Sequence, residues 1–170
     1  MTSKSSAIAL EAKAVSHRFG SQAVLDSINL SLRQGELTAL IGPNGAGKST
    51  LLHVLQGLLK PSQGDVFVGD TPVTSCRARI ALMPQRGRID WSFPITALDM
   101  VRLRKPKTRT GSFVVSAEEA LERVGLRERA KERLGRLSGG QQQRVLLAGA
   151  IAQNAATMLL DEPCSALDPP

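Results

Sequence analysis

The sequence predicts an α/β fold, and three stretches of the chain carry this prediction. The apolar segment 36–41 leads into a glycine-rich loop, residues 42–50, and then into a segment with helical character. Residues 28–32 alternate apolar and polar side chains, which is typical of a half-buried strand. A second apolar run, residues 157–160, ends in the acidic pair Asp161-Glu162. Strands and helices that follow one another in this way indicate a sheet covered by helices, and 170 residues suffice for about one such domain.

The other elements follow from local patterns. Ser116 and Glu119 have the spacing of a capping box, which marks the start of a helix, and Gly125 marks its end. The run 87–94 has no simple period and ends at a proline, so we expect a loop with exposed or docked apolar groups. We expect strands over residues 8–19, 28–32, 36–41, 65–68, 80–83 and 157–160, and helices over residues 51–56, 97–101, 116–125, 128–134 and 142–153.

The glycine-rich loop, Gly42-Pro43-Asn44-Gly45-Ala46-Gly47-Lys48-Ser49-Thr50, has the phosphate-loop pattern G-x-x-x-x-G-K-[ST], known as Walker A. Its glycines let the backbone curl with N–H groups pointing inward, and the helix that follows adds the positive end of its dipole. The pattern places the Lys48 ammonium against the β- and γ-phosphates of a nucleotide and the Ser49 hydroxyl against Mg²⁺. A chance glycine-rich turn is the alternative, which the strand before the loop and the helix after it disfavour.

Composition narrows the classes of partner. No apolar run reaches the roughly 18 residues of a membrane span, and the start of the chain lacks the apolar core of a signal peptide. Cys76 and Cys164 are isolated, which fits a reduced, cytosolic chain, and His17 and His53 are isolated, which favours structural roles over metal binding. The net charge of +7 allows nucleic acid, an anionic membrane surface or a nucleotide as partner, but the aromatic content of 3% argues against a base-stacking surface. The basic run 102–109 is either a solvated face or a contact to phosphates or lipid headgroups.

Three further features are candidates for function. Phe19 either stacks on an adenine ring or belongs to the core. The glycines of Leu137-Ser138-Gly139-Gly140-Gln141 stand at a predicted helix start, where they expose backbone N–H groups to an anion. Asp161 and Glu162 follow a strand, and carboxylates at the carboxyl end of a strand suit Mg²⁺ and water chemistry.

These pieces occur in a recognisable order: Phe19, the Walker A loop, Gln85, the LSGGQ sequence of residues 137–141, the acidic pair, and Ser165-Ala166-Leu167-Asp168. Taken together they resemble the ATP-binding cassette (ABC) ATPases across essentially the whole chain. The resemblance implies a phosphate-loop NTPase core with an antiparallel β amino-terminal part and an inserted α-helical subdomain. It implies one domain over residues 1–170, with residues 1–84 and 154–170 as nucleotide-binding core and residues 85–153, approximately, as Q-loop and helical signature subdomain.

The resemblance also implies a role for each matching residue. Phe19 would stack on the adenine of ATP, and Gly42 to Thr50 would wrap its phosphates. Glu162 would be the general base that polarises the attacking water, which Gln85 would help to place. Ser49, Gln85 and Asp161 would hold Mg²⁺, Asp161 partly through water. The signature residues Ser138, Gly139, Gly140 and Gln141 would reach the γ-phosphate bound by a second cassette, and residues 165–168 would form the D-loop that crosses the interface.

Partners follow from the same resemblance. One cassette supplies half of the phosphate cradle, so ATP would join two cassettes, as a homodimer, and hydrolysis would let them part and drive integral-membrane permease subunits. Residues 83–99, with Asp90-Trp91-Ser92-Phe93-Pro94, are similar to the importers of manganese, zinc and iron or iron chelates, in which this segment docks the permease; a family-neutral loop is the alternative. The metal would pass from a binding protein to the permease without touching this chain. We expect a cytoplasmic protein, peripheral on the inner face of the cell membrane, with no nucleic-acid partner.

Two departures from the family pattern leave alternatives open. The chain ends at Pro170, whereas ABC ATPases continue with further strands and a switch histidine, so we expect a truncated gene or a fragment that lacks both. Gly149 stands where relatives usually have an arginine. The alternatives are a nucleotide-binding remnant without turnover and a soluble ABC ATPase that acts on nucleic acid.

Overall fold

The computed structural model describes residues 7–104 and 115–163 of the 170-residue chain. They fall into two compact units, with the division after Ile80. Residues 105–109 of the basic run and the predicted D-loop at 165–168 lie outside the described residues. The expected division into nucleotide-binding core and signature subdomain stays a prediction.

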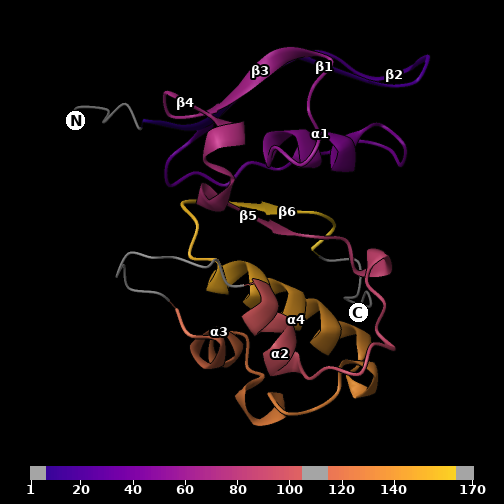
Figure 1. The fold of residues 1–170 in the computed structure, drawn as a ribbon, viewed down its shortest axis with the longest axis vertical. Coiled ribbons are helices and arrows are strands. Elements are labelled where there is room, and N and C mark those ends of the chain that lie inside the picture. Colours follow the sequence, from indigo (N-terminus) through magenta and orange to yellow (C-terminus); the bar gives the residue numbers. More distant parts are fainter. Residues whose placement is uncertain (1–6, 105–114, 164–170) are drawn as a thin grey trace. The chain divides into compact units, whose positions relative to one another are not determined.

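The amino-terminal unit is an antiparallel sheet with a helix, α1, packed against it (Figure 1). The strands lie in the order β2-β1-β3-β4. Leu10 and Val15 of β1, Val66 of β3, and Val54 and Leu55 of α1 are buried in its core. The elements are β1 (Ile8–Phe19), β2 (Gln22–Arg33), α1 (Lys48–Leu55), β3 (Gln63–Val68) and β4 (Thr71–Pro72), followed by the 3-10 turns Val73–Ser75 and Arg77–Arg79.

A bulge explains why β1 shows only a rough apolar alternation in the sequence. Its buried residues are Leu10 and Ala12 and then, out of phase, Val15 and His17. The phase changes at Ala14, whose φ of 48° is left-handed, and the pairing with both neighbouring strands shifts register there. Gly64 of β3 passes so close to the bulge that a Cβ atom on it would lie 2.3 Å from the Ala14 carbonyl oxygen.

The prediction of a buried strand at residues 36–41 is wrong. These residues have no strand structure, and the exposed fractions are 96% for Leu37, 47% for Leu40 and 90% for Ile41. A strand needs a hydrogen-bonded neighbour, and within the described residues this segment belongs to neither sheet. An apolar pattern therefore does not by itself make a strand, because a strand also needs a partner.

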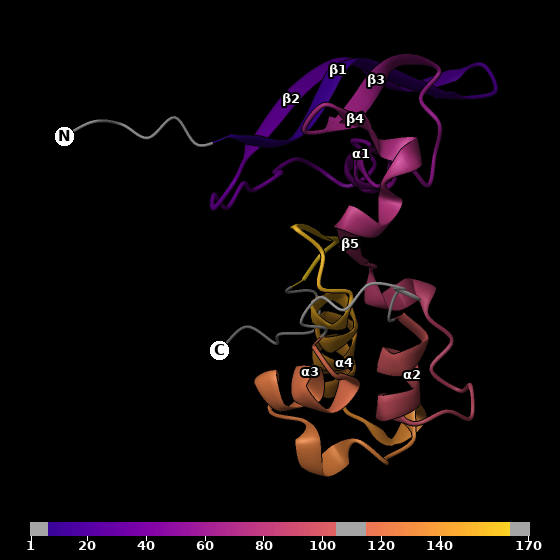
Figure 2. The same cartoon turned by 60° about the vertical axis from the view of Figure 1, so that its left-hand side comes forward.

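The carboxyl-terminal unit packs three helices together and against a two-stranded sheet of β5 and β6. Buried side chains of α2, α3 and α4 form one core cluster, while Ala81 and Met83 of β5 pack on Leu146 and Ala150 of α4. Figure 2 shows α4 between α3 and α2. The elements are β5 (Ile80–Met83), a 3-10 turn at Arg86–Arg88, α2 (Ala97–Arg104), α3 (Ala117–Arg123), α4 (Gly139–Ala152) and β6 (Thr157–Leu160).

The short helix predicted at residues 128–134 is also wrong. Two separate 3-10 turns, Arg127–Arg129 and Leu134–Arg136, stand there instead. The carbonyl groups of Ala130 and Glu132 accept hydrogen bonds from Leu98 N and Ala97 N, at the start of α2, at 2.8 and 3.0 Å. Because these carbonyls bind another helix, they are not available for helical hydrogen bonds of their own.

Helix α2 begins at the predicted residue and α3 one residue later, whereas α1 and α4 each begin three residues before the predicted ranges. Ser116 accepts a hydrogen bond from Glu119 N, but the Glu119 carboxylate pairs with Arg123 rather than closing the predicted capping box. The complete capping box is found at α4, between Ser138 and Gln141.

Strands 8–19, 80–83 and 157–160 are confirmed residue by residue. In the described part of the chain, no helix has the length and apolar character to cross a membrane.

Gly149, which departs from the family pattern, lies against the side chain of Arg104 on α2. A Cβ atom on Gly149 would lie 2.7 Å from Arg104 Cδ, so the side chain of Arg104 occupies the space over this glycine. Arg104 Nη2 donates to the Leu82 carbonyl oxygen at 3.1 Å. Burial lowers the pKa of Arg104. The glycine in the middle of α4 thus makes room for an arginine from α2.

Because of this contact, we expect Gly149→Ala to change the stability in the direction opposite to the usual one. Alanine in a helix interior is normally favoured over glycine by about 1 kcal/mol. Here we expect Gly149→Ala to destabilise the chain by about 1–2 kcal/mol, measured by urea unfolding, because the new methyl group displaces Arg104. In an Arg104→Ala background the same substitution should instead stabilise. Stabilisation in both backgrounds would contradict the packing described.

Candidate functional site

The loop at residues 42–50 has the backbone of an anion-binding turn. Gly45 and Gly47 have φ angles of 82° and 86°, a left-handed conformation that favours glycine. Gly47 is the N-cap of α1 and provides no side-chain acceptor for the first amides of the helix. Lys48 Nζ donates to the carbonyl oxygens of Gly42 and Pro43 at 2.8 and 2.6 Å. The loop therefore holds an ammonium group beside helix amides that have no side-chain cap, which suits a phosphate group.

The same unit brings Phe19 towards this loop. A Cβ atom on Gly47 would lie 2.9 Å from the carbonyl oxygen of Val24 in β2, so the loop packs directly on that strand. Phe19 pairs with Gln22, two residues from Val24. Phe19 is 52% exposed, and its ring meets the buried His17 ring in a T-shaped arrangement, with centroids 4.7 Å apart. The alternative that Phe19 belongs to the core is thereby wrong.

In the other unit, Gln85 and Glu162 meet. Gln85 follows β5, Glu162 follows β6, and Asp161 N donates to the Met83 carbonyl oxygen at 3.0 Å, which places the ends of the two strands side by side. Gln85 Nε2 donates to Glu162 Oε2 at 2.7 Å. The carboxylate at position 162 is therefore oriented by an amide that is 77 residues away in sequence.

The donor set suits Mg²⁺. Because the amide nitrogen of Gln85 is bound to Glu162, its amide oxygen is the atom that can face a cation. Asp161 is 3% exposed, and a buried carboxylate is well placed for a cation rather than for bulk water. A hydroxyl, an amide oxygen and a carboxylate are hard oxygen ligands of the kind that Mg²⁺ prefers. Ser49, the third predicted ligand, belongs to the other unit.

The backbone at Glu162 is strained. Its φ angle is 50°, which is costly for a residue with a Cβ atom. Gln143 of α4, which is 5% exposed, donates through Nε2 to the carbonyl oxygens of Glu162 and Pro163, both at 3.0 Å. Gln143 is a positioning residue that the sequence analysis missed; its only local signal is its place among three consecutive glutamines at a helix start.

The signature residues form the first turn of α4. Ser138 is the N-cap; its hydroxyl accepts from Gln141 N at 3.3 Å, and the Gln141 side chain accepts from Ser138 N at 2.8 Å. The capping box fixes the helix start and leaves the amides of Gly139 and Gly140 at the positive end of a 14-residue helix. Within their own unit, the predicted signature residues therefore have the geometry expected for contact with an anion.

The loop at residues 87–94 is half docked and half exposed. Trp91 packs against both core clusters of its unit, whereas Phe93 is 57% exposed. The Ser92 hydroxyl and backbone N–H both donate to Asp90 Oδ1. These hydrogen bonds hold the pKa of Asp90 below its usual value. The loop thus presents an aromatic ring on a fixed turn, as a docking surface requires.

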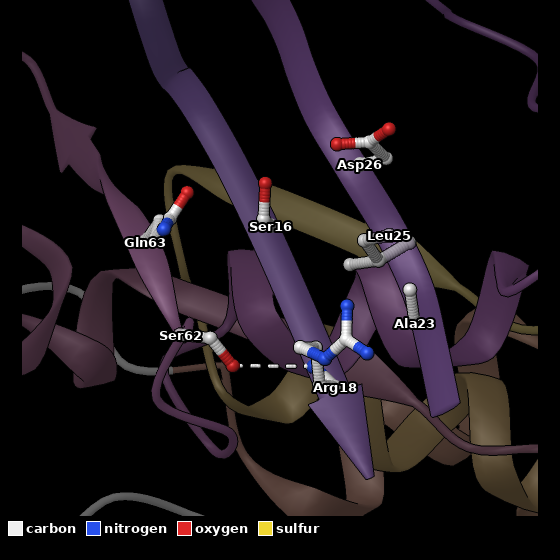
Figure 3. Close-up of a pocket in the computed structure, with 7 residues that line it drawn as sticks. All are labelled: Ser16, Arg18, Ala23, Leu25, Asp26, Ser62 and Gln63. Carbon is white, nitrogen blue, oxygen red and sulfur yellow. Dashed lines mark hydrogen bonds between the residues drawn. The ribbon is translucent and has the colours of Figure 1, made fainter. Parts of the chain in front are cut away.

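A separate hollow of about 220 Å³ lies on the amino-terminal sheet (Figure 3). Arg18 and Asp26 stand on neighbouring strands at its lining, and Arg18 N donates to the Ser62 hydroxyl at 3.2 Å. Its lining contains none of the predicted nucleotide-site residues. The full lining is Ser16, Arg18, Ala23, Leu25, Asp26, Ser62 and Gln63.

Comparison with known proteins decides the family. The profile of the ABC transporter family matches residues 25–165. The chain belongs to the ABC transporter family. Among ABC proteins of known structure, it is similar to a metal-chelate type ABC transporter in an inward-facing conformation, with a TM-score of 0.76 and 32% identity over 95% of this chain and 62% of that one. A nucleotide-free ATP-binding cassette matches with a TM-score of 0.77 and 26% identity, over 92% of this chain and 69% of that one. The predicted fold class is confirmed.

Several curated relatives are described as ATP-binding proteins of metal transport systems. A Chlamydia pneumoniae protein, described as a probable metal transport system ATP-binding protein, is 47% identical over 86% of this chain and 59% of its own length. The manganese transport system ATP-binding protein MntB of Listeria monocytogenes is 39% identical over 94% of this chain and 69% of its own length. The zinc transport system ATP-binding protein TroB of Treponema pallidum is 40% identical over 85% and 57%. The chain thus spans about 57–69% of the length of these relatives.

The strain at Glu162 predicts a difference between two variants of this ABC chain. Glu162→Gly and Glu162→Ala both lose the hydrogen bond to Gln85, but only alanine keeps a Cβ atom at a left-handed φ angle. We expect the glycine variant to be more stable by about 1 kcal/mol in urea unfolding. At Glu122, an exposed position of helix α3, the order should reverse, with alanine more stable than glycine by about 1 kcal/mol. The same order at both positions would contradict the strain.

Proposed function

We propose that the chain is the ATP-binding part of an ABC importer for a transition metal ion, that is, manganese, zinc or iron. The observation that carries the proposal is the combination, in one chain of this family, of a glycine-shaped loop that holds Lys48 and a Gln85–Glu162 pair joined at 2.7 Å. The metal as cargo is supported by relatives of manganese and zinc transport systems at 39–40% identity.

The proposal assigns the steps of ATP hydrolysis to named side chains. The amides of the loop and Lys48 bind the phosphates, and the exposed ring of Phe19 stacks on the adenine. Glu162 accepts the proton of the attacking water, while Gln85 holds the carboxylate in orientation and contacts the same water. Ser49, Gln85 and Asp161 would hold Mg²⁺, which when bound neutralises charge that develops on the phosphates.

The proposal also needs partners. Ser138 to Gln141 would reach the γ-phosphate of ATP bound by a second cassette, so a homodimer completes each site. The permease would dock on the loop that exposes Phe93. We place the chain on the cytoplasmic side of the membrane, bound to that permease. Unchanged uptake of manganese, zinc and iron in a strain that lacks the gene would contradict the assignment to metal import.

Lys48→Ala tests nucleotide binding. The ammonium contributes charge-assisted hydrogen bonds to phosphate oxygens, so we expect the affinity for Mg-ATP in calorimetry to fall roughly 10- to 100-fold. Lys60→Ala, which removes the same charge at an exposed position of the same unit, should bind as the wild type does. Equal loss of affinity in both variants would show that net charge, and not the loop, determines binding.

Glu162→Gln separates an ATPase from a nucleotide-binding remnant. If the chain turns over, we expect phosphate release to fall roughly 100-fold or more in this variant while Mg-ATP binding persists, because a general base contributes about that much. Glu128→Gln, at an exposed position of the same unit, should leave the rate unchanged. Background rates in the wild type and both variants, with binding intact, would instead favour the remnant.

The net charge of +7 favours one further candidate, a soluble ABC ATPase that acts on nucleic acid. Binding to nucleic acid that weakens steeply with salt concentration would support it, since displacement of counterions from phosphates produces that dependence.

A further inference from the structure

The residue that follows Gln85 makes three contacts with its guanidinium group. Arg86 Nε donates to Gln142 Oε1 at 2.8 Å. The guanidinium carbon lies 5.9 Å from the centre of the Trp91 ring, within the range of a cation–π contact. A Cβ atom on Gly139 would lie 3.5 Å from that same carbon and 3.6 Å from Nη2, so the group also packs against the first turn of α4.

Each of these partners is itself held in place. Gln142 is 5% exposed, and its Nε2 donates to the Leu134 carbonyl oxygen at 3.2 Å. Trp91 Nε1 donates to the carbonyl oxygen of Arg86 at 3.1 Å, so both the main chain and the side chain of Arg86 are fixed. Gly139 lies inside the capping box of α4, directly after the N-cap Ser138. The guanidinium is therefore a junction between three structured parts of one unit.

Electrostatics argues that this position does not serve the stability of α4. The amino-terminal end of a helix carries a partial positive charge, and a cation beside it is disfavoured. Arg86 nevertheless lies against Gly139, held there by the Trp91 ring and the Gln142 amide oxygen. Helix stability alone does not explain why the Arg86 guanidinium lies at the start of α4. A connection between the segment after Gln85 and the signature turn, called the tie below, does explain it.

We propose that Arg86 is a positioning residue that joins Gln85, the loop of Trp91 and the first turn of α4, so that these parts move as one. A displacement of the loop at residues 87–94 is then passed to Gln85 through the main chain and to Gly139 through the guanidinium. The inference rests on the proposed function in one respect, because it takes Gln85 and the signature turn as nucleotide-contacting parts. The tie itself depends only on contacts within one unit.

The chemistry of the contacts requires arginine rather than lysine. A planar guanidinium can donate through Nε in its plane while its face covers an indole ring and a glycine. An ammonium group is compact and donates from a single point, so it cannot reach the Gln142 oxygen and cover the Trp91 ring at once. Arg86→Lys therefore keeps the charge and removes the junction.

The tie can be tested without nucleotide, because Trp91 is the single tryptophan of the chain. In Arg86→Lys we expect acrylamide to quench Trp91 fluorescence more strongly, and we expect roughly tenfold faster amide exchange at Gly139 to Gln142, as the loss of a charged hydrogen bond and a cation–π contact implies. Arg136→Lys, an exposed arginine near the signature turn, is the matched control and should behave as the wild type does. Wild-type quenching and exchange in Arg86→Lys would overturn the tie.

A second measurement asks whether the tie transmits a signal. With Mg-ATP we expect the quenching of Trp91 to change in the wild type and in Arg136→Lys. In Arg86→Lys we expect that change to be lost, although calorimetry still detects ATP binding. If Arg86 had a merely structural role, Arg86→Lys would not lose the nucleotide-dependent change in Trp91 quenching while it still binds ATP. A nucleotide-dependent change of equal size in Arg86→Lys, or no change in a wild type that binds Mg-ATP, would overturn the inference. No heat in the wild type would refute the proposed function instead, and the nucleotide-free quenching would still decide whether the tie exists.

Discussion

In the carboxyl-terminal unit, the site residues depend on the pairing of β5 with β6, which the hydrogen bond from Asp161 N to the Met83 carbonyl oxygen extends beyond the last residue of β6. This junction places the residues that directly follow the two strands side by side. Gln85 comes two residues after Met83, and Glu162 comes directly after Asp161, so their side chains meet at 2.7 Å. Without the junction, two residues far apart in sequence would have no reason to be neighbours. The strained backbone at Glu162 is held by Gln143 from α4, which is itself packed on β5 through Leu146 and Ala150.

In the amino-terminal unit, the loop holds the Lys48 ammonium group beside the first turn of α1. Lys48 donates to two carbonyl groups of its own loop, and in the proposed function phosphate oxygens would replace these acceptors. The net gain is the difference between the two sets of hydrogen bonds, and it favours phosphate because hydrogen bonds between two charged groups are stronger than those to a neutral carbonyl. The loop is therefore shaped in advance by Gly45 and Gly47, and binding needs a change of partners rather than folding of the loop.

The predictability of each element from the sequence follows from the range of its interactions. Strands 8–19 and 80–83 could be predicted because their apolar pattern and flanking turns are local. Residues 36–41 have an equally apolar pattern, but a strand exists only where a neighbour pairs with it, and the pattern contains no information about the neighbour. The motif residues of the site could be read in order along the chain. Arg86 and Gln143 could not, because their roles depend on partners 56 and 19 residues away, and a single arginine or glutamine has no local signature.

The effect of Gly149, which departs from the family pattern, depends on its neighbours in the structure and not only on its position in the sequence. In the sequence it is a missing arginine and a weak point in a helix. In the structure the space above it is filled by Arg104, which reaches across from α2 to the Leu82 carbonyl oxygen on β5. A positively charged side chain from α2 therefore lies between α4 and β5. The glycine has a packing role of its own in this chain, so its presence alone is not evidence that the cassette has decayed.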